Sequence, residues 1–333
     1  MTAALPPAAA SRRSRNVALV SLVGGFVIFC AKMAAWFLTG SSAVLSDALE
    51  STVNVVAATF AVFALRFASR PADRDHPYGH GKIEFLSAAF EGGLISFAAV
   101  MIVYAAAEQL IRGPELRRLD LGLVVTAAAG GANLLLGSFV LREGRKLGSP
   151  TLVADGKHIL SDVWTTGGVL AGLALVRFTG MVWLDPAAAL VVGALLARTG
   201  VRLVRESVAA LLDAEDPRLL ERLVRAFNES RVDGLGGVHR LRAIRSGGVV
   251  HVDAHIFVPE HWTVLQAHEA VTRLEDAVKA RSGMAGELAL HLDPCHTGPC
   301  PGCDLPSCGR EIDLQAEVTL DEAVGPAAAR HRL

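Results

Sequence analysis

Residues 43–65 read AVLSDALESTVNVVAATFAVFAL, an apolar run that nevertheless carries several polar side chains. A membrane-spanning helix needs about 20 predominantly apolar residues, and this run has that length. Its polar residues are spaced at i, i+3, i+4 and i+7, so a helix places them roughly on one face: Asp47, Glu50, Ser51 and Asn54. Charged groups inside a bilayer are costly and usually pair or line a pathway. The stretch therefore predicts a transmembrane helix with a polar, functional face.

Five more apolar runs predict a helical membrane domain of six spans in all. They lie at about 17–38, 85–111, 121–141, 152–177 and 181–204. The composition agrees, because 52% of the residues are hydrophobic and only 20% are charged, and the mean hydropathy is +0.40. The first run has no small-residue cleavage site behind it, so we expect it to be retained rather than removed as a signal peptide.

The distribution of Lys and Arg predicts the orientation and excludes some partners. Positive residues gather around both termini and in the connections on the same side, for example Arg70, Arg74 and Lys82. The positive-inside rule then places both termini in the cytoplasm, and we expect a multi-pass protein of the inner cell membrane. Overall, 32 Lys and Arg face 33 Asp and Glu, which leaves no basic excess for nucleic acid. No nucleophile and base arrangement or cofactor motif indicates an enzyme.

The fifth apolar run carries a second polar pair inside the membrane. His158 and Asp162 are four residues apart, so they share one helix face. An imidazole with carboxylates is a donor set that divalent first-row metals accept. The alternative is a structural polar contact between helices. Lys32 and Glu108 lie near enough to span ends for their charges to reach the interface, whereas Glu91 has no expected partner.

A polar loop between the second and third runs reads RPADRDHPYGHGKIEF and contains Asp73, His76 and His80. Taken alone, a His-rich loop is more often simply solvated than metal-binding.

A soluble domain is predicted to begin at residue 213, where the apolar runs stop. Helical and strand-like segments then alternate in the order αββαβ, typical of a small two-layer α+β domain. The predicted division is 1–14 for an N-terminal segment, 15–212 for the six-helix membrane domain, 213–294 for the soluble domain, and 295–333 for a Cys-rich, flexible tail.

The tail gathers four cysteines and a histidine within 14 residues: Cys295, Cys300, Cys303, Cys308 and His296. Four thiolates at these spacings suit a closed tetrahedral zinc site or the delivery of a soft metal. The alternative is a set of reduced thiols facing solvent.

Taken together, SDALES, DHPYGHGKIE, HILSDV and LHLDPC, in this order and with an αββαβ domain, resemble the cation diffusion facilitator (CDF) family. The resemblance covers roughly residues 16–295. It implies a homodimer with six transmembrane helices per subunit and a metallochaperone-like cytoplasmic domain. It also implies export of Zn2+ or a related divalent ion from the cytoplasm in exchange for protons.

Position by position, Asp47, His158 and Asp162 match three of the four transport-site ligands of the family. The family's second carboxylate is replaced by Ser51, so Glu50, Asn54 or water are the candidates for the fourth ligand. This departure leaves the metal open among Zn2+, Fe2+, Mn2+, Co2+ and Cd2+.

The resemblance also assigns residues outside the transport site. In the loop, Asp73, His76 and His80 match a metal site of some relatives. Lys82 and Asp213 match a pair that joins the membrane helices to the cytoplasmic domain. In that domain, a set of residues matches positions that bind metal across the dimer interface: His239, His255, His268, His291 and Asp293. His251 shares a strand face with His255 and is a further candidate.

Two functions follow from these assignments. The first is a proton-coupled exporter that works by alternating access. The second is a transport-poor dimer that senses or delivers metal through its cytoplasmic domain and Cys tail, acting as a scaffold for another protein.

Overall fold

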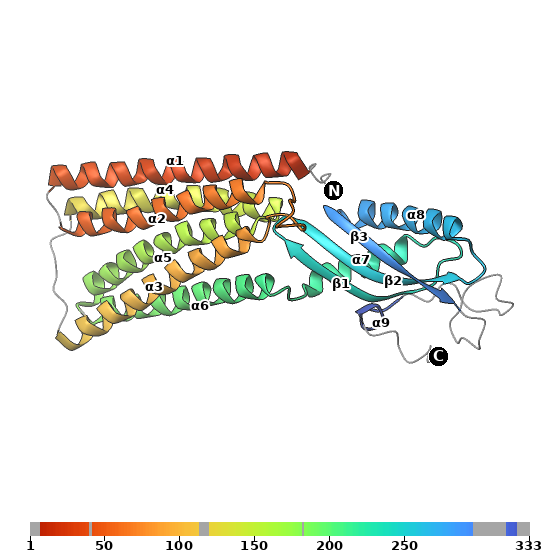
Figure 1. Ribbon diagram of the computed structural model, residues 1–333. Coiled ribbons are helices and arrows are strands. Elements are labelled where there is room, and N and C mark those ends of the chain that lie inside the picture. Colours follow the sequence, from red (N-terminus) through yellow and green to blue (C-terminus); the bar gives the residue numbers. More distant parts are fainter. Residues whose placement is uncertain (1–6, 40–41, 113–119, 182, 296–317, 325–333) are drawn as a thin grey trace. The chain divides into compact units, whose positions relative to one another are not determined.

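The computed structural model describes residues 7–39, 42–112, 120–181, 183–295 and 318–324 (Figure 1). Contacts divide the chain after Leu212 into a helical unit and a C-terminal unit. The helical unit consists of long helices that run from red to green in Figure 1. Their bounds are α1 Pro7–Thr39, α2 Ser42–Ala68, α3 Ile83–Arg112, α4 Asp120–Leu147, α5 Pro150–Thr179 and α6 Leu184–Leu211.

These helices coincide with the six apolar runs of the sequence. Within the described residues, four segments are long and apolar enough to cross a membrane: Ser11–Phe37, Ser51–Ala68, Ile83–Ile111 and Pro186–Leu211. The first half of helix α5 also carries Asp155, Lys157 and Asp162 among its apolar residues. Its polar face is therefore the part of the bundle that hydrophobicity alone does not explain.

Helix α5 occupies the centre of the helical unit. It contacts α1, α2, α3, α4 and α6, and its first turns are almost entirely buried, with Leu152, Ala154 and Asp155 at 0–1% exposure. A helix enclosed on several sides presents its side chains to other helices rather than to lipid. The polar residues of α5 therefore face protein.

Glycines allow the closest helix approaches in the unit. A Cβ atom on Gly156 of α5 would lie 2.6 Å from the backbone nitrogen of Leu141 in α4, and one on Gly144 of α4 would lie 2.8 Å from the backbone nitrogen of Val153 in α5. A Cβ on Gly200 of α6 would lie 2.8 Å from the carbonyl oxygen of Gly92 in α3. Small residues at such crossings let membrane helices pack backbone to backbone. The pairs α4/α5 and α3/α6 are therefore tightly joined.

The C-terminal unit follows the predicted αββαβ order and is built around a three-stranded sheet. Its elements are α7 Pro217–Glu229, β1 Val238–Ser246, β2 Val249–Pro259, α8 Val264–Ser282 and β3 Gly286–Cys295. The strand order is β1-β2-β3, with β1 and β2 antiparallel and β2 and β3 parallel. A parallel pair needs a crossover connection, which α8 supplies.

Local signals fix the ends of the two longer helices of this unit. Asp216 caps α7 by accepting from the backbone nitrogen of Arg218 at 3.0 Å, and Pro217 stands at the first helical position. Thr263 and Gln266 form a capping box at the start of α8. Gly283 ends α8 with a left-handed φ of 64°, which glycine adopts without strain.

One face of the sheet carries the hydrophobic core and the other is polar. Along β2, Val250, Val252, Ala254 and Ile256 alternate as buried residues that pack with α7 and α8. The intervening residues, including His251 and His255, lie on the opposite face because side chains alternate along a strand. His251 and His255 therefore lie on the face that the helices leave uncovered.

The expectation of a wholly flexible tail is wrong for residues 318–324. They include the short helix α9, Leu320–Val324, whose Ala323 is fully buried in the core. Asn228 of α7 holds the segment, since its amide nitrogen donates to the carbonyl oxygen of Val318 and its oxygen accepts from the nitrogen of Val318, both at 3.0 Å. Five helical residues are too few to show a period in sequence, whereas tertiary packing stabilises them.

The α4/α5 contact gives a stability prediction. We expect Gly156→Ala to lower the stability of the membrane domain by about 1–3 kcal/mol, because the added methyl group meets backbone atoms that cannot move aside easily. Gly131→Ala in α4 is the matched control: its Cβ meets nothing within 4 Å, so the change is neutral or stabilising by about 0.5–1 kcal/mol. Thermal unfolding in detergent measures both. Equal melting temperatures for the two variants would contradict the close packing.

Candidate functional site

Helix α5 contributes an imidazole and a carboxylate buried inside the helical unit. His158 is 4% exposed and Asp162 is 9% exposed. Within the described part of the chain, neither ring nitrogen of His158 has a hydrogen-bond partner. A buried imidazole with two uncommitted nitrogens is a group that a metal ion or a proton would satisfy.

Helix α2 faces this pair with an amide. The side-chain nitrogen of Asn54 donates to Oδ2 of Asp162, so these two predicted residues meet across α2 and α5. Asn54 is therefore the candidate for the fourth ligand that reaches the site. The side chains of Asp47 and Glu50 lie outside the described residues, and their part in the site stays a prediction.

Ser51, at the position of the family's second carboxylate, contacts a cation. The Nζ of Lys32 in α1 donates to Oγ of Ser51 at 2.8 Å, and Lys32 is only 4% exposed. From the sequence we expected the charge of Lys32 to reach the membrane interface. Its side chain is instead held inside the bundle. The resemblance implies a negative ligand at this position, which is occupied here by a hydroxyl beside an ammonium group.

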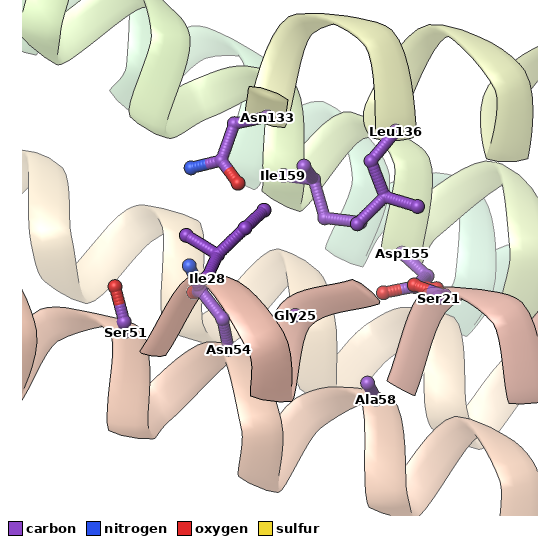
Figure 2. Close-up of a pocket in the computed structure, with 10 residues that line it drawn as sticks. All are labelled: Ser21, Gly25, Ile28, Ser51, Asn54, Ala58, Asn133, Leu136, Asp155 and Ile159. Carbon is purple, nitrogen blue, oxygen red and sulfur yellow. The ribbon is translucent and has the colours of Figure 1, made fainter. Parts of the chain in front are cut away.

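Figure 2 shows a cavity between α1, α2, α4 and α5 that includes this region. Polar side chains from all four helices line it: Ser21, Ser51, Asn54, Asn133 and Asp155. Apolar residues such as Ile28, Leu136 and Ile159 complete the wall. The sequence analysis did not select Ser21, Asn133 or Asp155. The available signal was the position of Asp155, three residues before His158 and therefore on the same face of α5.

The loop before α3 brings its three predicted residues together. Nδ1 of His76 lies 3.2 Å from Oδ1 of Asp73, and Nε2 of His80 lies 3.3 Å from Oδ2 of Asp73. Their ligand atoms all fall within 4.8 Å of one another. A backbone hydrogen bond from His76 lowers the pKa of Asp73, which keeps this carboxylate ionised. His80 is buried with its ring against Phe67, so one side of the group is fixed.

In the C-terminal unit, the strands place His239, His255 and Asp293 next to one another. His239 and His255 are register partners on β1 and β2, and Oδ2 of Asp293 on β3 lies 3.0 Å from Nε2 of His239 and 3.1 Å from Nδ1 of His255. His291 approaches the other carboxylate oxygen, with 3.4 Å between Nε2 and Oδ1. Two imidazoles and a carboxylate form a compact set of the type that divalent metals accept.

Burial and the neighbouring charges set the protonation of this cluster. Burial lowers the pKa of His239 despite the opposing charge of Asp293. Burial acts to raise the pKa of Asp293, but the hydrogen bond and charge of His255 and the contacts of His239 outweigh it, so the net shift is downward. Both shifts favour the metal-binding forms, a neutral imidazole and an ionised carboxylate.

The remaining predicted residues lie apart from these clusters or outside the described residues. His251 approaches Glu287 instead, with 3.7 Å between Nδ1 and Oε2, and His268 is exposed on α8. Lys82 precedes α3 and Asp213 begins the C-terminal unit, so their pairing stays a prediction. Cys295 ends β3, but its side chain lies outside the described residues, as do His296, Cys300, Cys303 and Cys308.

Comparisons with known proteins identify the family of the chain. The model of the cation efflux transmembrane domain matches residues 18–212, and that of the cation efflux protein cytoplasmic domain matches residues 218–295. An uncharacterized transporter of Synechocystis is 36% identical over 285 residues, which cover 85% of this chain and 91% of the relative. The cation-efflux pump FieF of Cronobacter sakazakii is 30% identical, covering 85% and 94%, and that of Serratia proteamaculans is 30% identical, covering 87% and 95%. With both domain models matched in chain order, this protein belongs to the cation diffusion facilitator, or cation efflux, family of membrane transporters.

Proposed function

We propose that this transporter exports divalent metal cations from the cytoplasm in exchange for protons, as a homodimer in the inner cell membrane with both termini cytoplasmic. The observation that carries the proposal is the buried pair His158 and Asp162 on α5, met by Asn54 of α2. The relatives named cation-efflux pumps support the direction of transport. The family's cytoplasmic domain, matched over residues 218–295, supports dimerisation.

The donor atoms favour borderline first-row ions as the substrate. Imidazole nitrogen and carboxylate or amide oxygen suit Zn2+, Fe2+, Mn2+ and Co2+, whereas no thiolate is found among the described residues of the site. Zn2+ is the first candidate, and Cd2+ the softest of those considered. No organic cofactor enters the proposal.

Proton coupling follows from the same residues. Metal ligands must be deprotonated, so a metal that enters from the cytoplasm displaces protons from His158 and the carboxylates. When the site opens to the other side, protons return to these groups and release the metal. A single set of residues then serves both fluxes, and alternating access prevents the site from opening to both sides together.

The clusters outside the membrane helices would regulate this cycle. Two groups each offer three ligands to a cytoplasmic metal ion. One consists of Asp73, His76 and His80, and the other of His239, His255 and Asp293. A metal that binds one state of the transporter better than the other shifts the population toward that state. His268, His291 and the Cys tail are further proposed ligands.

The sensor or scaffold function remains the second candidate, and the Lys32 contact is the observation that favours it. An ammonium group beside Ser51 opposes the entry of a divalent cation. A protein of this second kind would bind metal in its C-terminal unit but would move no ion across a membrane.

Loss of Asp162 tests transport directly. In liposomes with an imposed pH gradient, we expect saturable Zn2+ flux by the wild type, and a loss of at least about tenfold in Asp162→Ala, because a carboxylate that would bind the metal is removed. Thr59→Ala is the matched control, since this exposed hydroxyl of α2 bonds only the carbonyl of Val55 in its own helix. Wild-type protein inactive toward Zn2+, Mn2+, Fe2+ and Co2+ would instead favour the sensor function.

The Lys32 contact predicts an unusual mutational pattern at the fourth position. Ser51→Asp alone should change the half-saturating Zn2+ concentration little, because Lys32 is placed to pair with the new carboxylate. Lys32→Met combined with Ser51→Asp should lower that concentration at least about tenfold, because the carboxylate becomes available to the metal. Equal affinities of the single and double variants would show that Lys32 does not control the fourth position.

The cluster in the C-terminal unit predicts a pH dependence. An unfolded histidine titrates near pH 6.5, whereas the pKa of folded His239 is lower, so the unfolded chain binds protons first as the pH falls. Stability is therefore lost below about pH 6.5, and the lowered pKa of Asp293 extends the loss below about pH 4.

The measurement is the melting temperature of the metal-free full-length chain between pH 7.5 and 5.5. His239→Gln should show a smaller fall than the wild type, whereas His261→Gln, at an exposed position of the same unit, should follow the wild type. Added Zn2+ should raise the melting temperature at pH 7.5 because it binds the folded cluster. A fall in His239→Gln as large as in the wild type would contradict the role of His239.

A further inference from the structure

A pair of buried carboxyl groups lies between α3 and α5, apart from the proposed ligands. Glu91 of α3 is 0% exposed and Asp155 of α5 is 1% exposed, and their charges interact directly. Within the described residues, both carboxyl oxygens of Glu91 and the Oδ2 of Asp155 have no hydrogen-bond partner. Three buried, unsatisfied carboxyl oxygens in one place are uncommon in proteins and call for a missing partner.

Asp155 also faces the cavity of Figure 2. Its carboxyl group lies against Ser21 of α1, and Asn133 of α4 contributes an amide to the same cavity. Ser21 is itself only 1% exposed. The cavity that Asp155 faces is therefore lined by hydroxyl, amide and carboxylate oxygens.

Two adjacent carboxyl groups shielded from water do not both stay ionised without a compensating charge. A divalent cation supplies that charge and satisfies several oxygens at once. Oxygen-only donors suit hard ions, and Mn2+ is the hardest of the proposed substrates. The charge balance and the donor type therefore point to the same ligand class.

The location of the pair places it between one end of the helices and the proposed transport site. Glu84 near the start of α3 accepts a hydrogen bond from Ser149, which immediately precedes α5, so these two helix starts lie together. Glu91 and Asp155 each follow about two helical turns later. Positively charged residues gather near this end, which the proposed function assigns to the cytoplasm.

The pair is separate from the transport site, but Asp155 faces a cavity that Asn54 also lines. Asp155 precedes Asp162 by seven residues, which is a rise of about 10 Å along α5, too far for both carboxylates to bind one ion. Yet Asp155 lines the same cavity as Ser51 and Asn54, and Asn54 contacts Asp162. An ion at Asp155 would therefore have a polar route to Asp162.

We propose that Glu91 and Asp155 form a second divalent-cation site within the membrane domain, which holds an incoming ion before it reaches His158 and Asp162. The site takes a hard or borderline ion through carboxylate oxygens, with Ser21 and Asn133 beside it. The binding itself stands on the contacts described here, whereas its place ahead of the transport site rests on the proposed function.

The test counts Mn2+ ions bound to the purified full-length chain by electron paramagnetic resonance. Asp162→Ala removes the transport site, and the comparison adds Glu91→Gln and Asp155→Asn to that variant. The loop and C-terminal clusters are unchanged in both proteins, and thiolates are poor ligands for Mn2+. The difference in the number of bound Mn2+ ions therefore reports the membrane site. We expect a loss of about one tightly bound Mn2+ per chain, and an unchanged count overturns the proposal.

Single substitutions guard against misfolding of the combined variant. Glu91→Gln and Asp155→Asn conserve volume, and each should weaken this Mn2+ site at least about tenfold. Glu108→Gln on α3 is the matched control and should leave the count and the affinity as in the wild type. Wild-type affinity in both single variants overturns the proposal.

Flux measurements separate this proposal from the proposed function. In Glu91→Gln, the half-saturating Mn2+ concentration should rise while the maximal rate is reduced less, because the transport site is intact. If the wild type moves no ion, the transport function fails, but the loss of one bound Mn2+ still establishes the second site. If the wild type transports and the Mn2+ count does not change, only the second site is wrong.

Discussion

The charge carried by the interior of the helical unit is the constraint on which the rest of the structure depends. Apolar helices exclude water, so every ionisable group between them must meet an opposite charge, a hydrogen-bond partner or a proton. Helix α5 concentrates such groups and lies at the centre, in contact with α1 to α4 and α6. Among its neighbours, α2 places Asn54 against Asp162. Lys32 of α1 donates a hydrogen bond to Ser51 of α2 and so adds a further polar contact inside the bundle. An arrangement that gathers negative oxygens and uncommitted imidazole nitrogens in a low-dielectric interior is suited to a cation that enters and leaves.

The C-terminal unit places imidazole and carboxylate groups on one face of a sheet rather than between helices. Its core is apolar on one face of the sheet, and the candidate metal ligands on the other face place no charge within that core. Register across β1, β2 and β3 places His239, His255 and His291 in one row, with Asp293 close by. Sheet geometry, rather than helix periodicity, therefore brings these residues together. Burial favours the neutral form of His239, and the contacts of Asp293 with His255 and His239 favour the ionised carboxylate, which are the forms that bind metal.

Periodic features of the sequence predicted much of the fold, and contacts between helices were the part that it could not predict. The apolar runs indicated α1 to α6, strand alternation indicated β1 and β2, and the i, i+4 spacing placed His158 and Asp162 on one face. The partners of Lys32 and Glu91 were missed because they depend on how each helix is rotated against its neighbours, which no single-helix pattern determines. Helix α9 was missed because its stability comes from Asn228 and the core rather than from its five residues.

The glycine contacts between helices restrict how such a transporter changes shape. Backbone-to-backbone packing at Gly156 and Gly144 leaves α4 and α5 no room to slide or roll against each other, and Gly92 with Gly200 does the same for α3 and α6. In the proposed alternating access, each pair would therefore move as one rigid body, and the displacement would fall on the looser boundaries between bodies. The Asn54–Asp162 contact joins two helices that belong to different bodies, α2 and α5. A switch between inward-facing and outward-facing forms would thus separate Asn54 from Asp162. The movement that opens the site would then also lower its affinity for the ion.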